Sequence, residues 1–200
     1  FNIRRGYQGG ELMILQKSVG ELIKYVDERN TDGQIRKFYG ININKEFMPT
    51  VANVDNVDAT KYKVVKKNRF VFSGMQTGRD KTIRIALFQD DEPIIVSPAY
   101  TTFEIKDENI ILPEYFFMLF LSNESDRYGW FISDSSVRAN LDLSRFEEII
   151  FQIPPIEIQK KYIKIYRAIY RVEELNLKIK DICPVLIKGS LEEVAKSEKV

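Results

Sequence analysis

The feature that most constrains this chain is a heptad repeat of apolar residues near its C-terminus. The repeat has nine positions spaced alternately by four and three residues, and eight of the nine side chains suit an apolar seam. The positions are Ile158, Tyr162, Ile165, Ile169, Val172, Asn176, Ile179, Cys183 and Leu186. A helix with so narrow an apolar stripe is stabilised when it packs against a partner helix. The sequence therefore predicts a C-terminal helix that takes part in assembly.

The alternative for this helix is packing against the rest of its own chain. Asn176 favours a partner helix instead, because one polar residue in a coiled-coil seam fixes the register at some cost in stability. We expect the helix to run from Glu157 to about Asp181, since Pro184 should stop or kink it. The expected dimer contacts are Ile158, Tyr162, Ile165, Ile169, Val172, Asn176 and Ile179.

The absence of histidine limits the chemistry that this chain can perform. Histidine is the usual general base and the commonest metal ligand, and the chain has none. With Cys183 as its single cysteine, the chain also lacks the ligands of a structural zinc site and any internal disulfide. We expect no catalytic residues and no metal site. Catalysis is not excluded by this argument, because enzymes can work with carboxylates, lysine or tyrosine alone.

Hydropathy predicts neither a membrane span nor a secretion signal. The strongest apolar run, residues 115–121, is far shorter than the roughly 18 residues of a transmembrane helix. The N-terminus has no apolar segment followed by a small-residue cleavage site. A cytosolic location, without membrane contact, is the expectation.

The order of local patterns predicts an α/β (α+β) fold with a mixed, largely antiparallel sheet. Residues 41–103 are rich in β-like runs, and Pro113 should open a helix that extends to Leu121. We expect a loop over 122–140 and a last strand over 146–153. Pro154 and Pro155 then mark a boundary, so that 13–155 form the globular domain and 156–200 the long coiled-coil-type helix. Residues 1–12 join no pattern and are interpreted as an upstream or cloning-derived segment before Met13.

A net charge of +1 hides a local excess of positive charge. Residues 61–84 contain eight basic residues and only one acidic residue. Such a segment is typical of a patch for a polyanion, and equally of a solvated, lysine-rich strand and turn.

Two glycine- or serine-containing segments carry side chains suited to DNA. In the first, residues 74–81, the spacing is not that of a P-loop, and an ordinary hairpin loop is the alternative. In the second, residues 134–140, small hydroxyl residues stand beside arginine and asparagine, as they do on many surfaces without a partner. Trp130 precedes it and is expected in the core more than on a stacking surface. Arginine and the amides pair with base edges, and lysine meets phosphates. The candidates are Gln76, Arg79, Lys81, Ser136, Arg138 and Asn140.

The double proline at 154–155 argues against cofactor binding. DNA amino-methyltransferases use Asp or Asn before two prolines and an aromatic residue after them, whereas this chain has Ile153 and Ile156. A glycine-rich cofactor loop is also missing. We expect no bound S-adenosylmethionine and no other cofactor.

Several stretches together resemble the specificity subunits of type I restriction-modification systems. The resemblance covers roughly residues 22–190 and depends on the order and spacing of its motifs. The matching stretches are Val26–Asn30, Tyr39–Ile43, Phe47–Thr50, Tyr62–Val65, Gly78–Asp80, Val96–Thr101, Ser136–Arg138, Ile153–Gln159 and Ile182–Gly189.

The resemblance implies a target-recognition domain at 13–155 and a helical spacer or dimerisation region at 156–200. It implies double-stranded DNA as ligand, modification subunits that methylate adenine, and a restriction or motor subunit reached through them. A complete subunit resembles two such units in tandem, so this single unit is expected to be a half-subunit, a truncated form or a fragment that forms a homodimer. Arg79 and Arg138 lie in matching motifs, whereas the other four candidates rest on their chemistry alone.

Two alternatives remain open on the sequence. One is a recognition domain cut from a fused methyltransferase-nuclease, with methyltransferase motifs upstream of residue 1. The other is a coiled-coil adaptor that binds only protein, for which no salt-sensitive DNA binding is expected.

Overall fold

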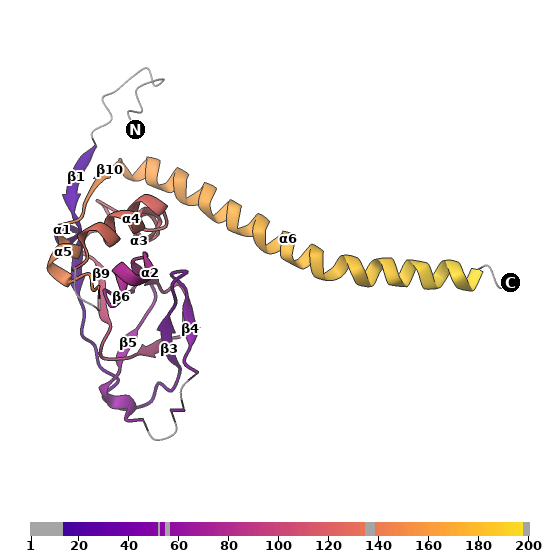
Figure 1. The fold of residues 1–200 in the computed structure, drawn as a ribbon, viewed down its shortest axis with the longest axis horizontal. Helices are drawn as coiled ribbons and strands as arrows, with labels where there is room; N and C mark the ends of the chain where they lie inside the picture. The colour runs from indigo at the N-terminus through magenta and orange to yellow at the C-terminus, as the bar shows by residue number, and fades with distance from the viewer. Residues whose placement is uncertain (1–13, 52, 55–56, 135–138, 198–200) are drawn as a thin grey trace, which may run out of the picture. The chain divides into compact units, whose positions relative to one another are not determined.

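The chain divides between Gln159 and Lys160 into two units, which are described separately. A computed structural model describes residues 14–51, 53–54, 57–134 and 139–197, with side chains to residue 188. Over these described ranges, the first unit holds every strand and all helices but the last (Figure 1). The second unit begins within the last helix, α6 (Ile156–Ser197), and contains this helix from Lys160 onward.

Ten strands of the first unit form three sheets. The strands are β1 (Leu15–Ser18), β2 (Ile23–Tyr25), β3 (Phe38–Ile41), β4 (Phe47–Pro49), β5 (Lys63–Val65), β6 (Phe70–Ser73), β7 (Arg84–Leu87), β8 (Ile94–Val96), β9 (Thr101–Ile105) and β10 (Ile150–Ile153). The sheet orders are β1-β10, β2-β9-β6-β7 and β4-β3-β8-β5. Only β3 and β8 pair in parallel among these strands, so the expected α+β fold with largely antiparallel pairing is confirmed.

Short helices connect and cover these sheets. They are α1 (Val19–Leu22), the 3-10 turn η1 (Ala59–Lys61), α2 (Thr77–Asp80), α3 (Pro113–Leu119), α4 (Asn123–Ile132) and α5 (Leu143–Glu147). Within the first unit, α3 and α4 lie toward the end that carries β1 and β10, whereas β3, β4 and β5 lie toward the other end (Figure 1).

The sheet β2-β9-β6-β7 has apolar side chains on both faces because its strands alternate with a period of two. Phe70 and Phe72 of β6 belong to a cluster that includes α3 and α5 residues, whereas Val71 belongs to a cluster shared with the β4-β3-β8-β5 sheet. Aromatic stacking fixes the first cluster, with ring centroids 4.9 Å apart for Phe70 and Phe103 and 4.1 Å for Phe72 and Phe146.

Two local predictions are wrong. The expected loop over 122–140 contains α4, which begins where the Ser122 hydroxyl accepts a hydrogen bond from Ser125 N. The expected strand over 146–153 is divided into α5 and β10. The glycine-containing segment 74–81 contains the single helical turn α2, so the alternative of a plain hairpin loop does not hold.

The helix α6 extends over Ile156–Ser197 and contains Pro184 in its interior. The expected end near Asp181 is therefore wrong. A proline inside a helix removes one hydrogen bond and typically costs about 3 kcal/mol, but the apolar, helix-compatible residues on both sides of Pro184 continue the helix.

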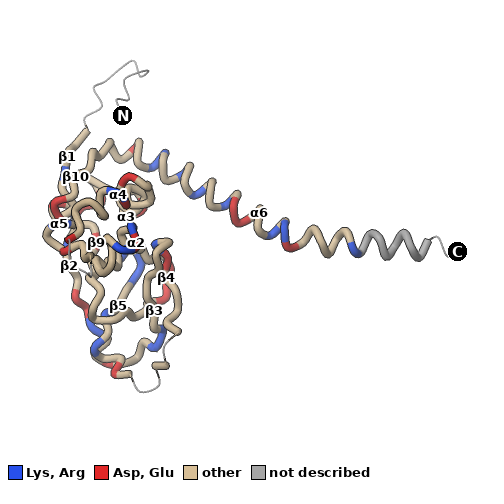
Figure 2. The backbone as a smooth tube through the Cα atoms, viewed as in Figure 1, with Lys and Arg blue, Asp and Glu red and all other residues tan. Residues whose placement is uncertain are grey.

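The basic residues of 61–84 are mostly neutralised within the fold. Seven of the eight form ion pairs with carboxylates. Basic and acidic residues are both distributed over the backbone of this unit (Figure 2). The excess charge seen in the sequence is therefore not, by itself, a basic patch.

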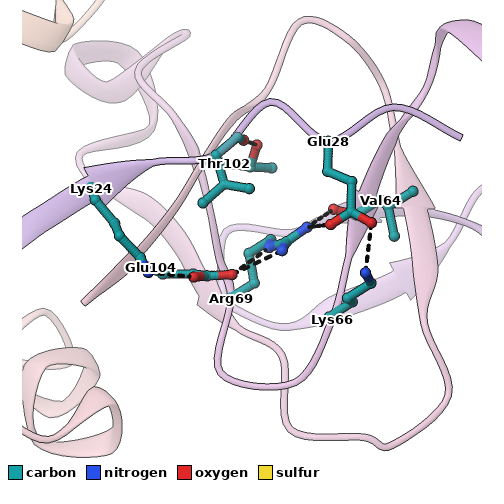
Figure 3. A network of polar contacts seen from close by, with 8 residues as sticks. Lys24, Glu28, Val64, Lys66, Arg69, Thr102 and Glu104 are labelled. Carbon is teal, nitrogen blue, oxygen red and sulfur yellow. Dashed lines mark hydrogen bonds and ion pairs between the residues drawn. The ribbon is translucent and has the colours of Figure 1, made fainter. Parts of the chain in front are cut away.

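Arg69 is the centre of the largest of these networks. Its side chain is 6% exposed and lies between two carboxylates, with Nη1 2.9 Å from Glu28 and Nη2 2.8 Å from Glu104 (Figure 3). Nη1 also donates to the Val64 carbonyl at 2.7 Å. Buried guanidinium groups need this degree of pairing, because an unpaired buried charge is strongly destabilising.

Acid should weaken this network. The hydrogen bond from Lys66 is the main cause that lowers the pKa of Glu28 below its ordinary value of 4.5, and Arg69 adds to it against the effect of burial. Burial raises the pKa of Glu104, but hydrogen bonds from Arg69 and Lys24 outweigh it and leave the pKa lowered. Both folded-state pKa values lie below the unfolded ones, so the stabilisation is present above pH 4.5 and is lost as the pH falls through the lowered values.

Urea unfolding at a series of pH values measures this effect. We expect the free energy of unfolding to fall as the pH drops below 4.5, and to fall less steeply in Glu104→Gln, which cannot ionise. Equal slopes for the variant and the parent would contradict the assignment.

Candidate nucleic-acid interface

The structure brings together the two segments that the sequence singled out. Backbone hydrogen bonds join Gly78 N to the Ala139 carbonyl and Leu141 N to the Gly74 carbonyl, both at 2.8 Å. The Asn140 side chain adds a third bond, since its Oδ1 accepts from Gln76 N at 3.0 Å. The turn at 74–81 is thus a fixed element, braced by residues more than 60 positions away.

Strained backbone is concentrated at this place. Among the described residues, five non-glycine positions have positive φ, and three of them, Gln76 (62°), Lys81 (54°) and Ala139 (46°), belong to the two joined segments. Such conformations are unfavourable for residues with a Cβ and persist where the surroundings impose them, often at functional sites.

Close packing leaves this element little freedom. A Cβ at Gly74 would lie 1.8 Å from the Leu141 carbonyl oxygen, and one at Gly78 would lie 2.7 Å from Ala139 Cβ. On the other side, α2 lies against α4, where a Cβ on the buried Gly129 would lie 2.4 Å from Ile83 Cγ1 (Figure 1). A residue with a side chain would collide with these atoms, so glycine is required at the three positions.

A cation and an aromatic ring meet on the surface of this element. The Lys81 Nζ lies 5.4 Å from the centroid of the Trp130 ring, a cation–π distance. Trp130 is 49% exposed, so the expectation that it lies in the core is wrong. Phe131 beside it is 80% exposed. Within the described part of the chain, Lys81 is the one basic residue of 61–84 that pairs with a ring instead of a carboxylate.

Arg79 lies on the same turn with its side chain 62% exposed. Its Nη2 donates to Gln76 Oε1 at 2.5 Å, and its Nε donates to Asp80 at 3.1 Å. Burial raises the pKa of Asp80, but the hydrogen bonds from Arg79 and Arg84 outweigh it and keep the pKa below its ordinary value. Asp80 therefore remains charged and orients the guanidinium group.

The sequence-predicted residues are thus partly assembled. Gln76, Arg79, Lys81 and Asn140 belong to one element, although the Asn140 oxygen is used to brace the turn. Ser136 and Arg138 lie outside the described residues. Sequence reasoning missed Trp130 as a surface residue, and its spacing to Tyr128 in a polar segment was the available signal.

Metal clusters and membrane-spanning helices are both absent from the described residues. The cysteine, aspartate and glutamate side chains of these residues form no group of three that would hold a metal ion. No helix in the same part of the chain combines the length and hydropathy needed to cross a membrane.

Comparison with known proteins places the chain in a family. Residues 14–189 match the family described as the type I restriction modification DNA specificity domain. Because the match extends over most of the sequence, the chain belongs to this family.

Individual relatives are distant and longer. The HindI specificity subunit of Haemophilus influenzae is 26% identical over 140 residues, which cover 68% of this chain and 30% of that protein. The crystal structure of a type I S subunit from M. genitalium has a TM-score of 0.48 at 14% identity, covering 86% of this chain and 43% of the other. A structure of a type I restriction-modification system gives 0.49 at 9% identity, covering 83% and 41%. The chain therefore spans less than half of each of these relatives.

Proposed function

We propose that this chain is the DNA-recognition subunit, or a recognition unit, of a type I restriction-modification complex. In this role it is not catalytic: it binds double-stranded DNA and directs adenine methylation and cleavage by modification and restriction subunits. The proposed place of action is the cytoplasm. Membership of the DNA specificity family supports the class of function, and the surface around Lys81 and Trp130 supports the site.

The observation that carries the proposal is the position of Lys81 over Trp130 on a braced, strained turn beside Arg79. An exposed aromatic ring next to two cations can contact the phosphate backbone and the bases together. Arginine side chains can contact guanine bidentately, and for Arg79 this requires exchanging its bonds with Gln76 and Asp80 for bonds to the base. Lys81 acts as a point charge for phosphate. The fixed turn holds these groups ready before DNA arrives, which reduces the entropy lost on binding.

The same proposal gives α6 the role of a spacer that forms a homodimer. Ile165, Ile169, Val172 and Ile179 are each more than half exposed along the predicted seam, and Tyr162 is 46% exposed. Ile158 is half-buried, and Asn176 is exposed. Apolar side chains in a continuous heptad register favour burial against a second helix. A two-fold dimer would present two copies of the DNA surface.

Mapping of methylated adenines in the host genome tests the function. We expect one split, adenine-containing motif to lose its methylation when the gene is deleted and to regain it on complementation with the parent gene. Complementation with Arg79→Ala tests whether the proposed surface carries the specificity. An unchanged methylation pattern after deletion would contradict the proposed function.

A further inference from the structure

Lys45 is a buried lysine in an unfavourable backbone conformation. It lies in the turn between β3 and β4, its side chain is 6% exposed, and its φ is 64°. Glycine or asparagine would adopt this conformation at lower cost. A lysine that is both buried and left-handed indicates that its side chain has a task that offsets the strain.

The ammonium group of Lys45 joins three segments of the chain. It donates to both carboxylate oxygens of Asp126 in α4, at 2.9 and 2.7 Å, and to Thr82 Oγ1 at 2.9 Å. Asp126 Oδ1 also accepts from Ile83 N at 2.9 Å. The β3–β4 turn, the segment after α2 and the helix α4 are therefore held at one point.

This point lies next to the two residues of the cation–π pair. Thr82 directly follows Lys81, and Asp126 lies one helical turn before Trp130. The contact between Gly129 and Ile83 limits how closely α4 approaches. The bonds from Lys45 Nζ and from Ile83 N meet on Asp126, one turn earlier on the same helix. Buried ion pairs contribute little net stability but can select one arrangement over others.

We infer that Lys45 is a positioning residue of the DNA-binding surface: it does not touch DNA but sets the register of α4, so that Trp130 meets Lys81. This inference rests on the proposed DNA-recognition function. It assigns a role to a residue that lies 36 positions before Lys81 in the sequence.

Trp130 is the only tryptophan of the chain, so its fluorescence reports on this contact without DNA. In the full chain, Lys45→Met should shift the emission and the acrylamide quenching of Trp130 toward those of Lys81→Met, in which the cation is absent. Lys66→Met is the matched control, since it removes the same charge from the exposed ion pair with Glu28. Lys45→Asn is a second variant that suits the left-handed backbone, in case the buried methionine prevents folding.

Binding of a mixed-sequence DNA duplex, followed by anisotropy in the same protein preparations, gives the second readout. We expect both Lys45 variants to bind about tenfold more weakly than the parent, the loss typical of one misplaced contact, and Lys66→Met to bind as the parent does. Folded Lys45 variants with unchanged Trp130 fluorescence would overturn the positioning role. Altered fluorescence with unchanged DNA affinity would overturn its link to DNA. Absence of DNA binding by the parent, also with modification subunits present, would contradict the proposed function, while the fluorescence result would still decide the role of Lys45 in the fold.

Discussion

Replacing Arg79 and Lys81 together with alanine should weaken DNA binding by about 100-fold, because each cation in contact with DNA contributes roughly 1–3 kcal/mol. Both side chains are exposed on one braced turn, so their removal leaves the core untouched. The slope of log affinity against log salt should become shallower by up to about two, one for each phosphate that is no longer neutralised. Titration of a labelled duplex at several salt concentrations measures both quantities.

The matched control is the double variant Lys66→Ala and Lys67→Ala. It removes two positive charges from the same basic segment, but both lysines are paired with carboxylates away from the turn. This control changes only the long-range attraction that depends on net charge and removes no proposed contact with DNA. It should therefore lose affinity only slightly. Equal losses in the two double variants would mean that net charge, and not the turn, determines binding.

Single variants separate contact with the phosphate backbone from base recognition. Lys81→Ala should weaken binding to all duplexes alike, whereas Arg79→Ala should also relax the sequence preference if it meets guanine. Arg138→Ala belongs in the same series, measured in the complex with modification subunits. If Arg79→Ala and Arg138→Ala both leave DNA binding unchanged there, the assignment of the site is wrong.

The site shows what a single sequence reveals and what it hides. The candidates Gln76, Arg79 and Lys81 could be selected because residue type and local spacing are visible in the sequence. Their bracing by Asn140 was not, because it depends on a hydrogen bond across 64 positions. The same holds for the ion pairs that neutralise the basic segment, since their carboxylates come from Asp27, Glu28 and Asp91.

Secondary structure was predicted well where one physical signal dominates. The β-rich middle and the long helix follow from two clear periodicities, of 2 and about 3.5 residues. The helix α4 has no such pattern: its face is polar, it contains Gly129, and tertiary contacts hold it through Ile83 and Asp126. Lys45 was also missed, because neither its backbone conformation nor its pairing with the distant Asp126 is visible in the sequence.

Replacing Ile165 and Val172 with glutamate should convert the expected dimer to monomers. The two positions lie one heptad apart in the seam and are 56% exposed in the single chain. In a dimer they would be buried in both copies, where each large apolar side chain contributes about 1.5–3 kcal/mol and a carboxylate is strongly disfavoured. The dissociation constant should rise by at least about a thousandfold.

Lys164→Glu is the matched control for charge. It changes the net charge by as much as the double variant and lies next to Ile165, but it is outside the heptad seam. Glutamate is a good helix former, so both proteins should keep their helix content in circular dichroism. Sedimentation equilibrium should therefore show dimers for the parent and for Lys164→Glu, and monomers only for the seam variant.

Asn176 provides the complementary test, because it is the polar position of the seam. Asn176→Leu should keep or tighten self-association, since it replaces a polar layer by an apolar one, but should loosen the register and broaden the range of oligomers.

If the glutamate variant still forms dimers, the seam is not the contact and self-association must come from the first unit. If Asn176→Leu gives a single, unchanged dimer, Asn176 does not set the register. Monomers for the first variant and mixed oligomers for the second would together assign to α6 both the strength and the geometry of assembly.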